Sequence, residues 1–343
     1  MSTHRQVGFA LVGVGSIGEV HASNLASKIS NARLEALVDS EPRRLEAAAR
    51  KLGVSKAVNN FDAVLSDDKV EAVVLAVPTF LKLDMVKKAA AAGKHIFTEK
   101  PMGLTLQQAD EMALAVKKGG VKLQVGYQRR FDHAYLKAKK AVEDGLLGNL
   151  EMVSSRTRDP PGNPQGWLTD PALSGGIWLD TVSHDIDSIR FLTGCEITKV
   201  YAEATTLVYE QLKPKGDYDN LVMTMKLSNG ALAYIDSCAY TPYGYDIRVE
   251  LVGTKAAALI EMGNNTSFNL LGPSTAQVND SPQSYPERFA QAYRDEMEDF
   301  ARCVIEDKNP RAGLAEGRAA NEVGLAAWDS FKQGRPVMIQ GGQ

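Results

Sequence analysis

The stretch Val7-Gly8-Phe9-Ala10-Leu11-Val12-Gly13-Val14-Gly15-Ser16-Ile17-Gly18 decides the fold of the first part of this 343-residue chain. Its first six residues read as a buried strand, and a helix is expected to begin at the last glycine. In the Gly-x-Gly-x-x-Gly turn between them, the first glycine permits the tight turn and the second lets the backbone approach a pyrophosphate. The third lets the helix pack on the strand. This pattern favours a phosphate-binding turn at the N-terminus of a helix, where N–H groups face the ligand.

A carboxylate follows at the end of the second predicted strand. Leu34–Val38 is the second predicted strand, and Asp39 comes 21 residues after Gly18. A carboxylate at that position can accept hydrogen bonds from an adenosine ribose and repels a ribose 2′-phosphate. Strand, turn, helix and acid together predict a dinucleotide site that takes NAD in preference to NADP. Arg43 and Arg44 could swing towards such a phosphate, but a solvated first helical turn is the simpler interpretation.

Up to about residue 126, short apolar runs alternate with segments of helical period. Continuous apolar strands separated by helices are typical of a parallel sheet that is covered on both faces. The sequence therefore predicts an α/β fold whose residues 1–126 form a doubly wound dinucleotide-binding domain. The further elements expected here are helices at Gly18–Ala26, Arg43–Leu52, Lys82–Ala92 and Thr105–Lys118 and strands at Val70–Val77, His95–Thr98 and Val121–Val125.

The pattern changes after residue 126, where several long strands follow one another. Ser228-Asn229-Gly230 is typical of a hairpin turn, so residues 127–343 are predicted to form an α+β domain with a large, mainly antiparallel, open sheet. The strands are expected at Leu150–Arg158, Ile197–Tyr209, Asp219–Leu227, Ala231–Tyr240 and Ile247–Gly253, and the helices at Phe131–Glu143, Leu179–Leu192, Glu287–Glu306 and Ala315–Phe331.

Composition excludes several classes of protein. There are 39 lysines and arginines against 42 aspartates and glutamates, a formal net charge of −3, which provides no long-range field for nucleic acid or anionic lipid. Cys195, Cys238 and Cys303 are far apart, so no disulfide and no metal site is expected from their spacing. The apolar run Val7–Val12 is too short for a membrane span and lacks the features of a signal peptide. We expect a cytoplasmic protein with reduced thiols.

A lysine stands at the end of the fourth predicted strand of the first domain, in Thr98-Glu99-Lys100-Pro101. Ligands of doubly wound sheets bind beyond the carboxyl ends of the strands, so Lys100 is expected to project into the cofactor cleft. A fixed ammonium there could polarise a hydroxyl and stabilise the developing alkoxide. For an isolated lysine the alternative would be a surface residue before a turn proline.

Three motifs, in the order and at the spacing of the family, resemble the glucose–fructose oxidoreductase/inositol dehydrogenase (Gfo/Idh/MocA) family, and the likeness covers essentially the whole chain. They are Glu99-Lys100-Pro101, the segment GYQRRFD at 126–132 and the segment SGGIWLDTVSHD at 174–185. The segment SRTRDPP at 155–161 further resembles the inositol 2-dehydrogenase branch. One departure is visible: the family often carries a histidine four residues after Pro78, where this chain has Lys82. How the loop from Pro78 to Lys82 contacts the cofactor is therefore left open.

The resemblance implies a catalytic group of Lys100, Asp180 and His184. Asp180 and His184 are four residues apart and would share one face if the segment were a single helix. An imidazole is the natural base for a hydroxyl proton near neutral pH, so His184 is expected to be the base. Asp180 would orient the site, and Lys100 would stabilise the alkoxide. The alternative for His184 alone is a helix histidine satisfied by Asp187 or by the backbone.

Further residues are expected at the cofactor and the substrate, and no metal ligands are expected. A polyol is bound by hydrogen-bonding side chains and an aromatic wall, although each such residue here could equally be structural. The expected cofactor contacts are Gly13, Gly15, Ser16, Ile17, Gly18, Asp39, Ser40, Arg43, Val77, Pro78, Thr79, Glu99, Lys100 and Gln128. The expected substrate contacts are Lys100, Tyr127, Arg129, Asp159, Asp180, His184, Tyr243 and Tyr245.

The resemblance implies an NAD-dependent dehydrogenase of a cyclitol, with myo-inositol and its 2-keto product scyllo-inosose as first candidates. A dehydrogenase of a pyranose or another sugar is the nearest alternative. Two rivals come from other classes: a glycosidase that holds NAD permanently, and a non-catalytic nucleotide sensor that binds a transcription factor. The presence of Lys100, Asp180 and His184 together argues against the sensor. The open sheet of the second domain is expected to be covered by another subunit, giving a homodimer or homotetramer.

Overall fold

The structure, a computed structural model, describes residues 5–261, 263 and 282–339. The chain divides into two compact units. The first comprises Met1–Asp132, Ala172–Gly175 and Gln291–Glu322, and the second comprises His133–Pro171, Gly176–Ala290 and Val323–Gln343. This division differs from the predicted boundary near residue 126, because Gln291–Glu322 belongs with the N-terminal unit rather than with the rest of the C-terminal half.

The sheet of the first unit is parallel throughout, with strand order β3-β2-β1-β4-β5-β6. The order reverses between β1 and β4, which is the topological switch point of a doubly wound fold. The predicted fold class is confirmed. The strands are β1 (Val7–Val12), β2 (Ala32–Val38), β3 (Lys56–Val58), β4 (Ala72–Leu75), β5 (His95–Glu99) and β6 (Leu123–Gly126).

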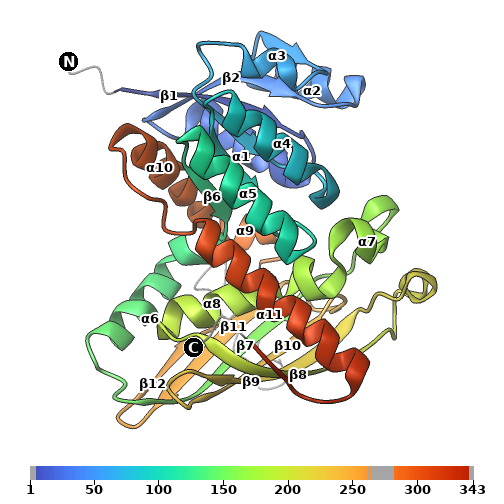
Figure 1. Ribbon diagram of the computed structural model, residues 1–343, viewed down its shortest axis with the longest axis vertical. Coiled ribbons are helices and arrows are strands. Elements are labelled where there is room, and N and C mark those ends of the chain that lie inside the picture. The colour runs from blue at the N-terminus through green and yellow to red at the C-terminus, as the bar shows by residue number, and fades with distance from the viewer. Residues whose placement is uncertain (1–4, 262, 264–281, 340–343) are drawn as a thin grey trace, which may run out of the picture. The chain divides into compact units, whose positions relative to one another are not determined.

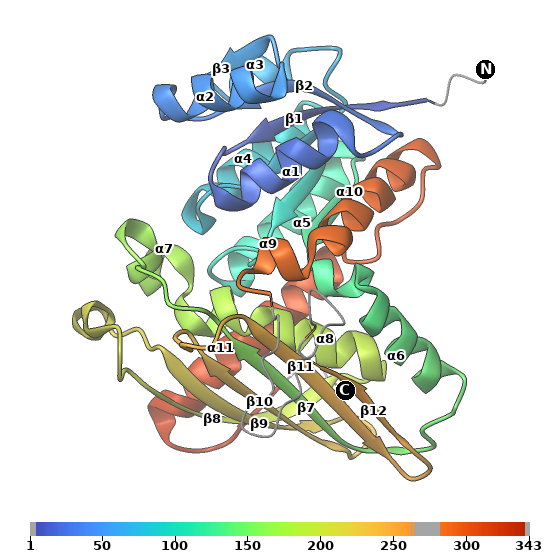
Figure 2. The ribbon, with the colours of Figure 1, turned by 180° about the vertical axis from the view of Figure 1, so that it is seen from behind.

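Helices cover both faces of this sheet. α4 and α5 lie in front of it in Figure 1, whereas α1 and α10 come to the front in Figure 2. The helices that belong wholly to the first unit, apart from the first residue of α10, are α1 (Ser16–Ser27), α2 (Pro42–Leu52), α3 (Asp62–Leu65), α4 (Lys82–Ala91), α5 (Leu106–Gly119) and α10 (Ala290–Ile305), with 3₁₀ helices at Thr79–Leu81 and Gln128–Phe131. α11 (Leu314–Gln333) begins in this unit.

The core of the first unit explains why α10 packs there. All six residues of β1 are buried, which is why the run is continuously apolar instead of alternating. Phe9 of β1 meets Phe300 of α10 with ring centroids 6.1 Å apart, and Met297 belongs to the same buried cluster as Leu25 of α1. Each such side chain contributes about 1.5–3 kcal/mol by leaving water.

The second unit contains a seven-stranded sheet in the order β12-β11-β7-β10-β9-β8-β13. Its neighbours pair antiparallel except β7 and β10, which pair in parallel. The predicted mainly antiparallel sheet is thus confirmed, with one exception. The strands are β7 (Leu150–Arg158), β8 (Ile197–Thr205), β9 (Asn220–Leu227), β10 (Leu232–Cys238), β11 (Asp246–Gly253), β12 (Ala257–Ile260) and β13 (Val337–Met338).

Several predicted elements are shorter or divided in the structure. The single helix predicted at Leu179–Leu192 is a π-helical turn (Ile177–Thr181) followed by α8 (Ser183–Thr193). The helix predicted at Glu287–Glu306 is divided into α9 (Tyr285–Arg288) and α10. Two further helices of this half are α6 (His133–Glu143) and α7 (Pro171–Ser174). Within the described residues, no helix has both the length and the apolar character needed to cross a bilayer.

Candidate active site

The glycine turn after β1 has the shape that a phosphate-binding loop requires. Gly13 has a φ of +91°, a conformation that favours glycine. A Cβ at Gly13 would clash with the carbonyl oxygen of Ala76, and one at Gly18 would clash with the carbonyl of Gly13. A Cβ at Gly15, in contrast, would meet no atom within 4 Å. The turn is therefore closed towards the protein and open on the side where a ligand would lie, at the N-terminus of α1.

Asp39, at the end of β2, is held by three neighbours. Its carboxylate accepts hydrogen bonds from the backbone N–H of Val14 (2.7 Å) and of Glu41 (2.8 Å) and from Arg44 (2.7 Å). Burial alone would raise the pKa of Asp39, but these hydrogen bonds outweigh it and the pKa lies below its ordinary value. Asp39 is thus a fixed anion beside the glycine turn. The guanidinium that pairs with it belongs to Arg44, whereas Arg43 and Ser40 are exposed.

The loop after β4 leads to a buried lysine at the start of α4. Val77 and Pro78 are half-buried, Thr79 is buried, and the 3₁₀ helix Thr79–Leu81 leads into α4. Lys82, the first residue of α4, is only 1% exposed. Lys82 therefore has a structural role, because its ammonium contacts the residues at the end of β5.

The turn that carries Lys100 follows β5 directly. Lys82 Nζ donates to the carbonyl oxygens of Glu99 (2.6 Å), Lys100 (2.8 Å) and Pro101 (3.1 Å). The peptide bond between Lys100 and Pro101 is cis. The Glu99 carboxylate is hydrogen-bonded to His21 Nε2 at 2.7 Å. The carbonyls of the main chain on either side of Lys100 are therefore held by Lys82, while the Lys100 residue is half-buried.

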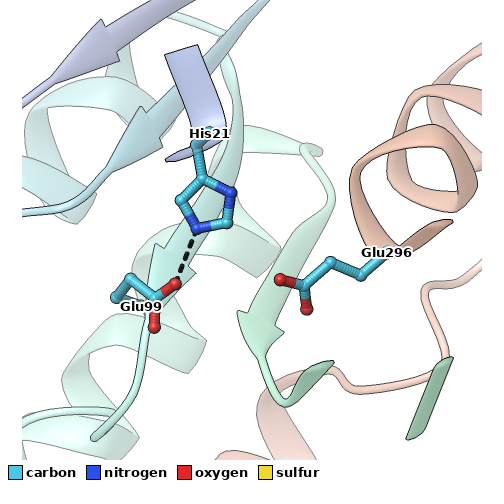
Figure 3. A group of neighbouring side chains, drawn as sticks. All are labelled: His21, Glu99 and Glu296. Carbon is cyan, nitrogen blue, oxygen red and sulfur yellow. Dashed lines mark hydrogen bonds and ion pairs between the residues drawn. The ribbon is translucent and has the colours of Figure 1, made fainter. Parts of the chain in front are cut away.

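A buried group of three ionisable side chains includes Glu99, the residue before Lys100 (Figure 3). His21, Glu99 and Glu296 come from α1, β5 and α10, and one ligand atom of each lies within 4.8 Å of the others. Glu296 is fully buried, and neither of its carboxylate oxygens has a hydrogen-bond partner. Burial and the charge of Glu99 raise the pKa of Glu296 well above its ordinary value.

A histidine and two carboxylates are donors that a divalent cation accepts. A proton on Glu296, however, removes the repulsion between the two carboxylates without any ion. We therefore interpret Glu296 as a neutral carboxylic acid. The spacing of residues in the sequence could not reveal this group, because its members are supplied by distant segments.

In the second unit, the turn that carries Asp180 is shaped by Gly176 and Asp217. Gly176 has a φ of +59°, and a Cβ there would clash with the Asp217 carboxylate. That carboxylate accepts a hydrogen bond from the Ile177 N–H at 3.0 Å, at the start of the π-helical turn. The pKa of Asp217 is raised, first by burial and further by the charge of Asp180. Asp180 therefore lies near a second carboxylate that the sequence did not indicate.

His184 lies in the first turn of α8, and its neighbour Asp185 fastens this turn to the sheet. Asp185 is fully buried and accepts hydrogen bonds from Ser155 Oγ (2.6 Å) and Thr157 Oγ1 (2.8 Å) of β7. His184 itself is half-buried. Because Asp180 belongs to the π-helical turn and His184 to α8, they do not share one continuous α-helix, contrary to the sequence interpretation.

The expected substrate and cofactor residues outside these turns differ in exposure. Tyr127, Gln128 and Arg129, in the first unit, are at most 2% exposed. In the second unit, Tyr245 is buried against Phe289.

Tyr243, also in the second unit, is 51% exposed and donates a hydrogen bond to Asp246 at 3.2 Å. Asp159 is half-buried, and its carbonyl accepts a hydrogen bond from the Thr241 N–H. Contacts of all these residues with a ligand stay predictions.

Comparison with known proteins identifies the class of this protein. A family model described as an oxidoreductase family with an NAD-binding Rossmann fold matches residues 7–127. A second model, the GFO/IDH/MocA C-terminal domain, matches residues 135–259. The protein is therefore an NAD-dependent oxidoreductase built on a Rossmann domain.

Individual relatives match nearly the whole chain. A scyllo-inositol 2-dehydrogenase (NAD(+)) of Bacillus subtilis (strain 168) is 35% identical over 334 residues, 97% of this chain and 96% of that protein. A myo-inositol 2-dehydrogenase of Thermotoga maritima is 33% identical and covers 96% of this chain and 98% of its own length. The crystal structure of scyllo-inositol dehydrogenase from Lactobacillus casei with bound NAD(H) and scyllo-inositol has a TM-score of 0.89 at 29% identity, over 98% and 99% of the two chains. The chain belongs to the Gfo/Idh/MocA family of oxidoreductases.

Proposed function

We propose that the protein is an inositol 2-dehydrogenase that oxidises the C2 hydroxyl of myo-inositol to 2-keto-myo-inositol with NAD. The observation that carries the proposal is the Lys100 turn, in which the Lys82 ammonium donates to three main-chain carbonyls and His21 holds the side chain of Glu99. Relatives named as inositol 2-dehydrogenases that match nearly the full chain support this substrate class. Because their names include both scyllo- and myo-inositol, the preferred isomer is itself part of the proposal.

The residues of the first unit fit NAD. The open side of Gly15 admits a pyrophosphate, and the Asp39 carboxylate can accept further hydrogen bonds from ribose hydroxyls. Asp39 already neutralises Arg44, the arginine that would otherwise be available to a 2′-phosphate. When bound, the nicotinamide accepts the hydride that leaves the alcohol carbon.

Lys100 is proposed to bind the reacting hydroxyl and to stabilise the alkoxide character that develops on its oxygen. A lysine ammonium donates three hydrogen bonds, and one of them directed at that oxygen is stronger in the transition state than in the ground state. A fixed main chain matters here, because an ammonium on a flexible stem loses entropy on being oriented. The contacts of Glu99 and Lys100 described above reduce that loss.

His184 is proposed to take the hydroxyl proton, and Asp180 to orient the substrate and support the charge on its partners. An imidazole suits a proton transfer near neutral pH. The fastening of α8 by Asp185 limits the freedom of the His184 main chain. Tyr127, Arg129, Asp159, Tyr243 and Tyr245 remain proposed substrate contacts.

We also propose that a second copy of the chain covers the open face of the second sheet, giving a homodimer or homotetramer. This face carries exposed apolar side chains at alternate strand positions, including Met152 (45% exposed), Leu232 (54%) and Tyr234 (36%). Met152 and Leu232 are direct register partners on β7 and β10.

A cytoplasmic location is proposed on the sequence grounds alone. We also propose a domain boundary near residue 126.

The substrate assignment is tested by initial rates of NADH and NADPH formation against a panel of polyols. The panel holds myo-inositol, scyllo-inositol, D-chiro-inositol, glucose, xylose and galactose. We expect NADH formation with one or more inositols at a kcat/KM at least about 10-fold above any sugar. Faster turnover of a pyranose would replace the inositol proposal by sugar dehydrogenation, and no NADH with any of them would refute it.

A further inference from the structure

Lys82 is a charged side chain in a place where neither the helix nor the protein interior favours a charge. It begins α4, and a cation at a helix N-terminus is opposed by the positive end of the helix dipole. It is also 1% exposed, and burying an ammonium is costly unless hydrogen bonds compensate. Helix stability and packing therefore do not account for this lysine.

The compensation comes from three consecutive carbonyl oxygens of one turn. The Nζ atom lies 2.6, 2.8 and 3.1 Å from the carbonyl oxygens of Glu99, Lys100 and Pro101. An ammonium has three N–H donors, so it can donate to all three of these carbonyls at once. Three adjacent carbonyls that point at one atom fix the direction of the intervening peptide planes. The residue in the middle of this set is Lys100.

We propose that Lys82 is a positioning residue for Lys100: its ammonium holds the turn in the one arrangement from which the Lys100 side chain acts. This inference rests on the proposed role of Lys100 in the reaction. Removal of the ammonium takes one donor from each of the three carbonyls. The carbonyls of Glu99 and Pro101 keep the Thr98 hydroxyl (3.3 Å) and the Gly103 N–H (2.9 Å), but the common anchor of the three is lost and the turn relaxes. A displacement of about 1 Å at a catalytic group lowers the rate by up to about 100-fold.

The first test is a kinetic cycle with myo-inositol and scyllo-inositol as substrates. Lys82→Met keeps the length and apolar stem of the side chain and removes its charge. We expect kcat to fall about 10- to 100-fold, with the affinity for NADH changed less than about 3-fold. In the Lys100→Met background, the same change should lower kcat by less than about 2-fold, because the group that Lys82 positions is absent.

A primary deuterium isotope effect on kcat distinguishes positioning from a loss of folded enzyme. In Lys82→Met the effect should rise, because hydride transfer becomes slower relative to product release. A merely structural role would lower the melting temperature and the yield but leave the isotope effect unchanged. Lys87→Met is the matched control on α4, since Lys87 is exposed and pairs with Glu111 at the surface, and its kcat and isotope effect should equal those of the wild type.

Two outcomes separate the inference from the function on which it rests. Absence of NADH formation by the wild type with either inositol would overturn the proposed function, and near-normal turnover of Lys100→Met would remove Lys100 from the reaction and this inference with it. A normal Lys82→Met beside a crippled Lys100→Met would overturn only the role of Lys82. If Lys82→Met does not fold, Lys82→His replaces it, since an imidazole is polar but cannot donate to three carbonyls.

A crystal structure of the Lys82 variant with NADH supplies a readout that needs no turnover. We expect a displaced Lys100 main chain and side chain relative to the wild-type crystal. An unmoved Lys100 would refute the inference.

Discussion

Replacing Glu296 by glutamine should stabilise the protein at neutral and alkaline pH. Glu296 is fully buried without a hydrogen-bond partner, and burial together with the charge of Glu99 raises its pKa well above the ordinary value. In the unfolded chain the same carboxyl titrates near its ordinary pKa of about 4.3. Between these two pKa values the folded state binds one proton more than the unfolded state.

The sign and size of the effect follow from that one proton. The carboxylic acid contributes its full stability below the unfolded pKa, and this contribution is lost as the pH rises towards the folded pKa. The loss is about 1.4 kcal/mol per pH unit within the window, because one proton is involved. Glutamine has the shape of the neutral acid and does not titrate, so Glu296→Gln should be free of this loss.

The assay is equilibrium unfolding by urea at intervals from about pH 4 to about pH 8, with the slope of stability against pH compared between variants. Near pH 4 the wild type and Glu296→Gln should agree within about 1 kcal/mol, and the variant should gain on the wild type as the pH rises. Glu298→Gln, on the same helix but only half-buried, is the matched control and should keep the wild-type slope. Parallel slopes for the wild type and Glu296→Gln would refute the neutral acid, and a stability that depends on added divalent cation would point to a metal ion instead.

Three further changes test the site. Lys100→Met should lower kcat by about 10²–10³-fold with NADH binding retained, measured by steady-state rates and NADH fluorescence; near-normal turnover would remove Lys100 from the mechanism. His184→Asn should lose on the order of 10²–10⁴ in kcat and should flatten the acidic limb of the pH–rate profile, since that limb reports protonation of the base; an unchanged limb would assign the base elsewhere. Asp39→Ser releases Arg44 from its ion pair, so the ratio of kcat/KM with NAD to kcat/KM with NADP should fall about 10-fold or more. A wild type that already prefers NADP would contradict the proposal that Asp39 binds the ribose of NAD.

The local parts of the fold could be predicted from the sequence because short-range patterns determine them. β1 is found at Val7–Val12, as expected from a continuous apolar run, and α2 contains Pro42 in its first turn and ends before Gly53. The glycine turn was also predictable, since the pattern of glycines reflects local steric limits on a Cβ at Gly13 and Gly18. Hydrophobic periodicity predicted the helix α10 but not the sheet on which its apolar face packs. That sheet is the one of the first unit, where Phe300 contacts Phe9 of β1.

The parts that escaped prediction depend on contacts between distant segments. The π-helical turn around Asp180 is set by Asp217, 40 residues from Ile177, and nothing near Asp180 in the sequence signals it. Asp185 is fastened by hydroxyls of β7, and Glu296 joins His21 only through the fold. Lys82 stands in the sequence 17 to 19 residues before its partners at the end of β5, and spacing alone does not indicate that contact.

The most direct test of the proposed reaction follows one hydrogen atom. The protein is incubated with NAD and myo-inositol deuterated at C2, and the reduced cofactor is analysed by mass spectrometry and proton NMR. Hydride transfer from C2 requires one deuterium at C4 of the nicotinamide in each NADH formed, together with an equal amount of the 2-keto product. NADH without deuterium, or conversion of the substrate without net NADH, would contradict it.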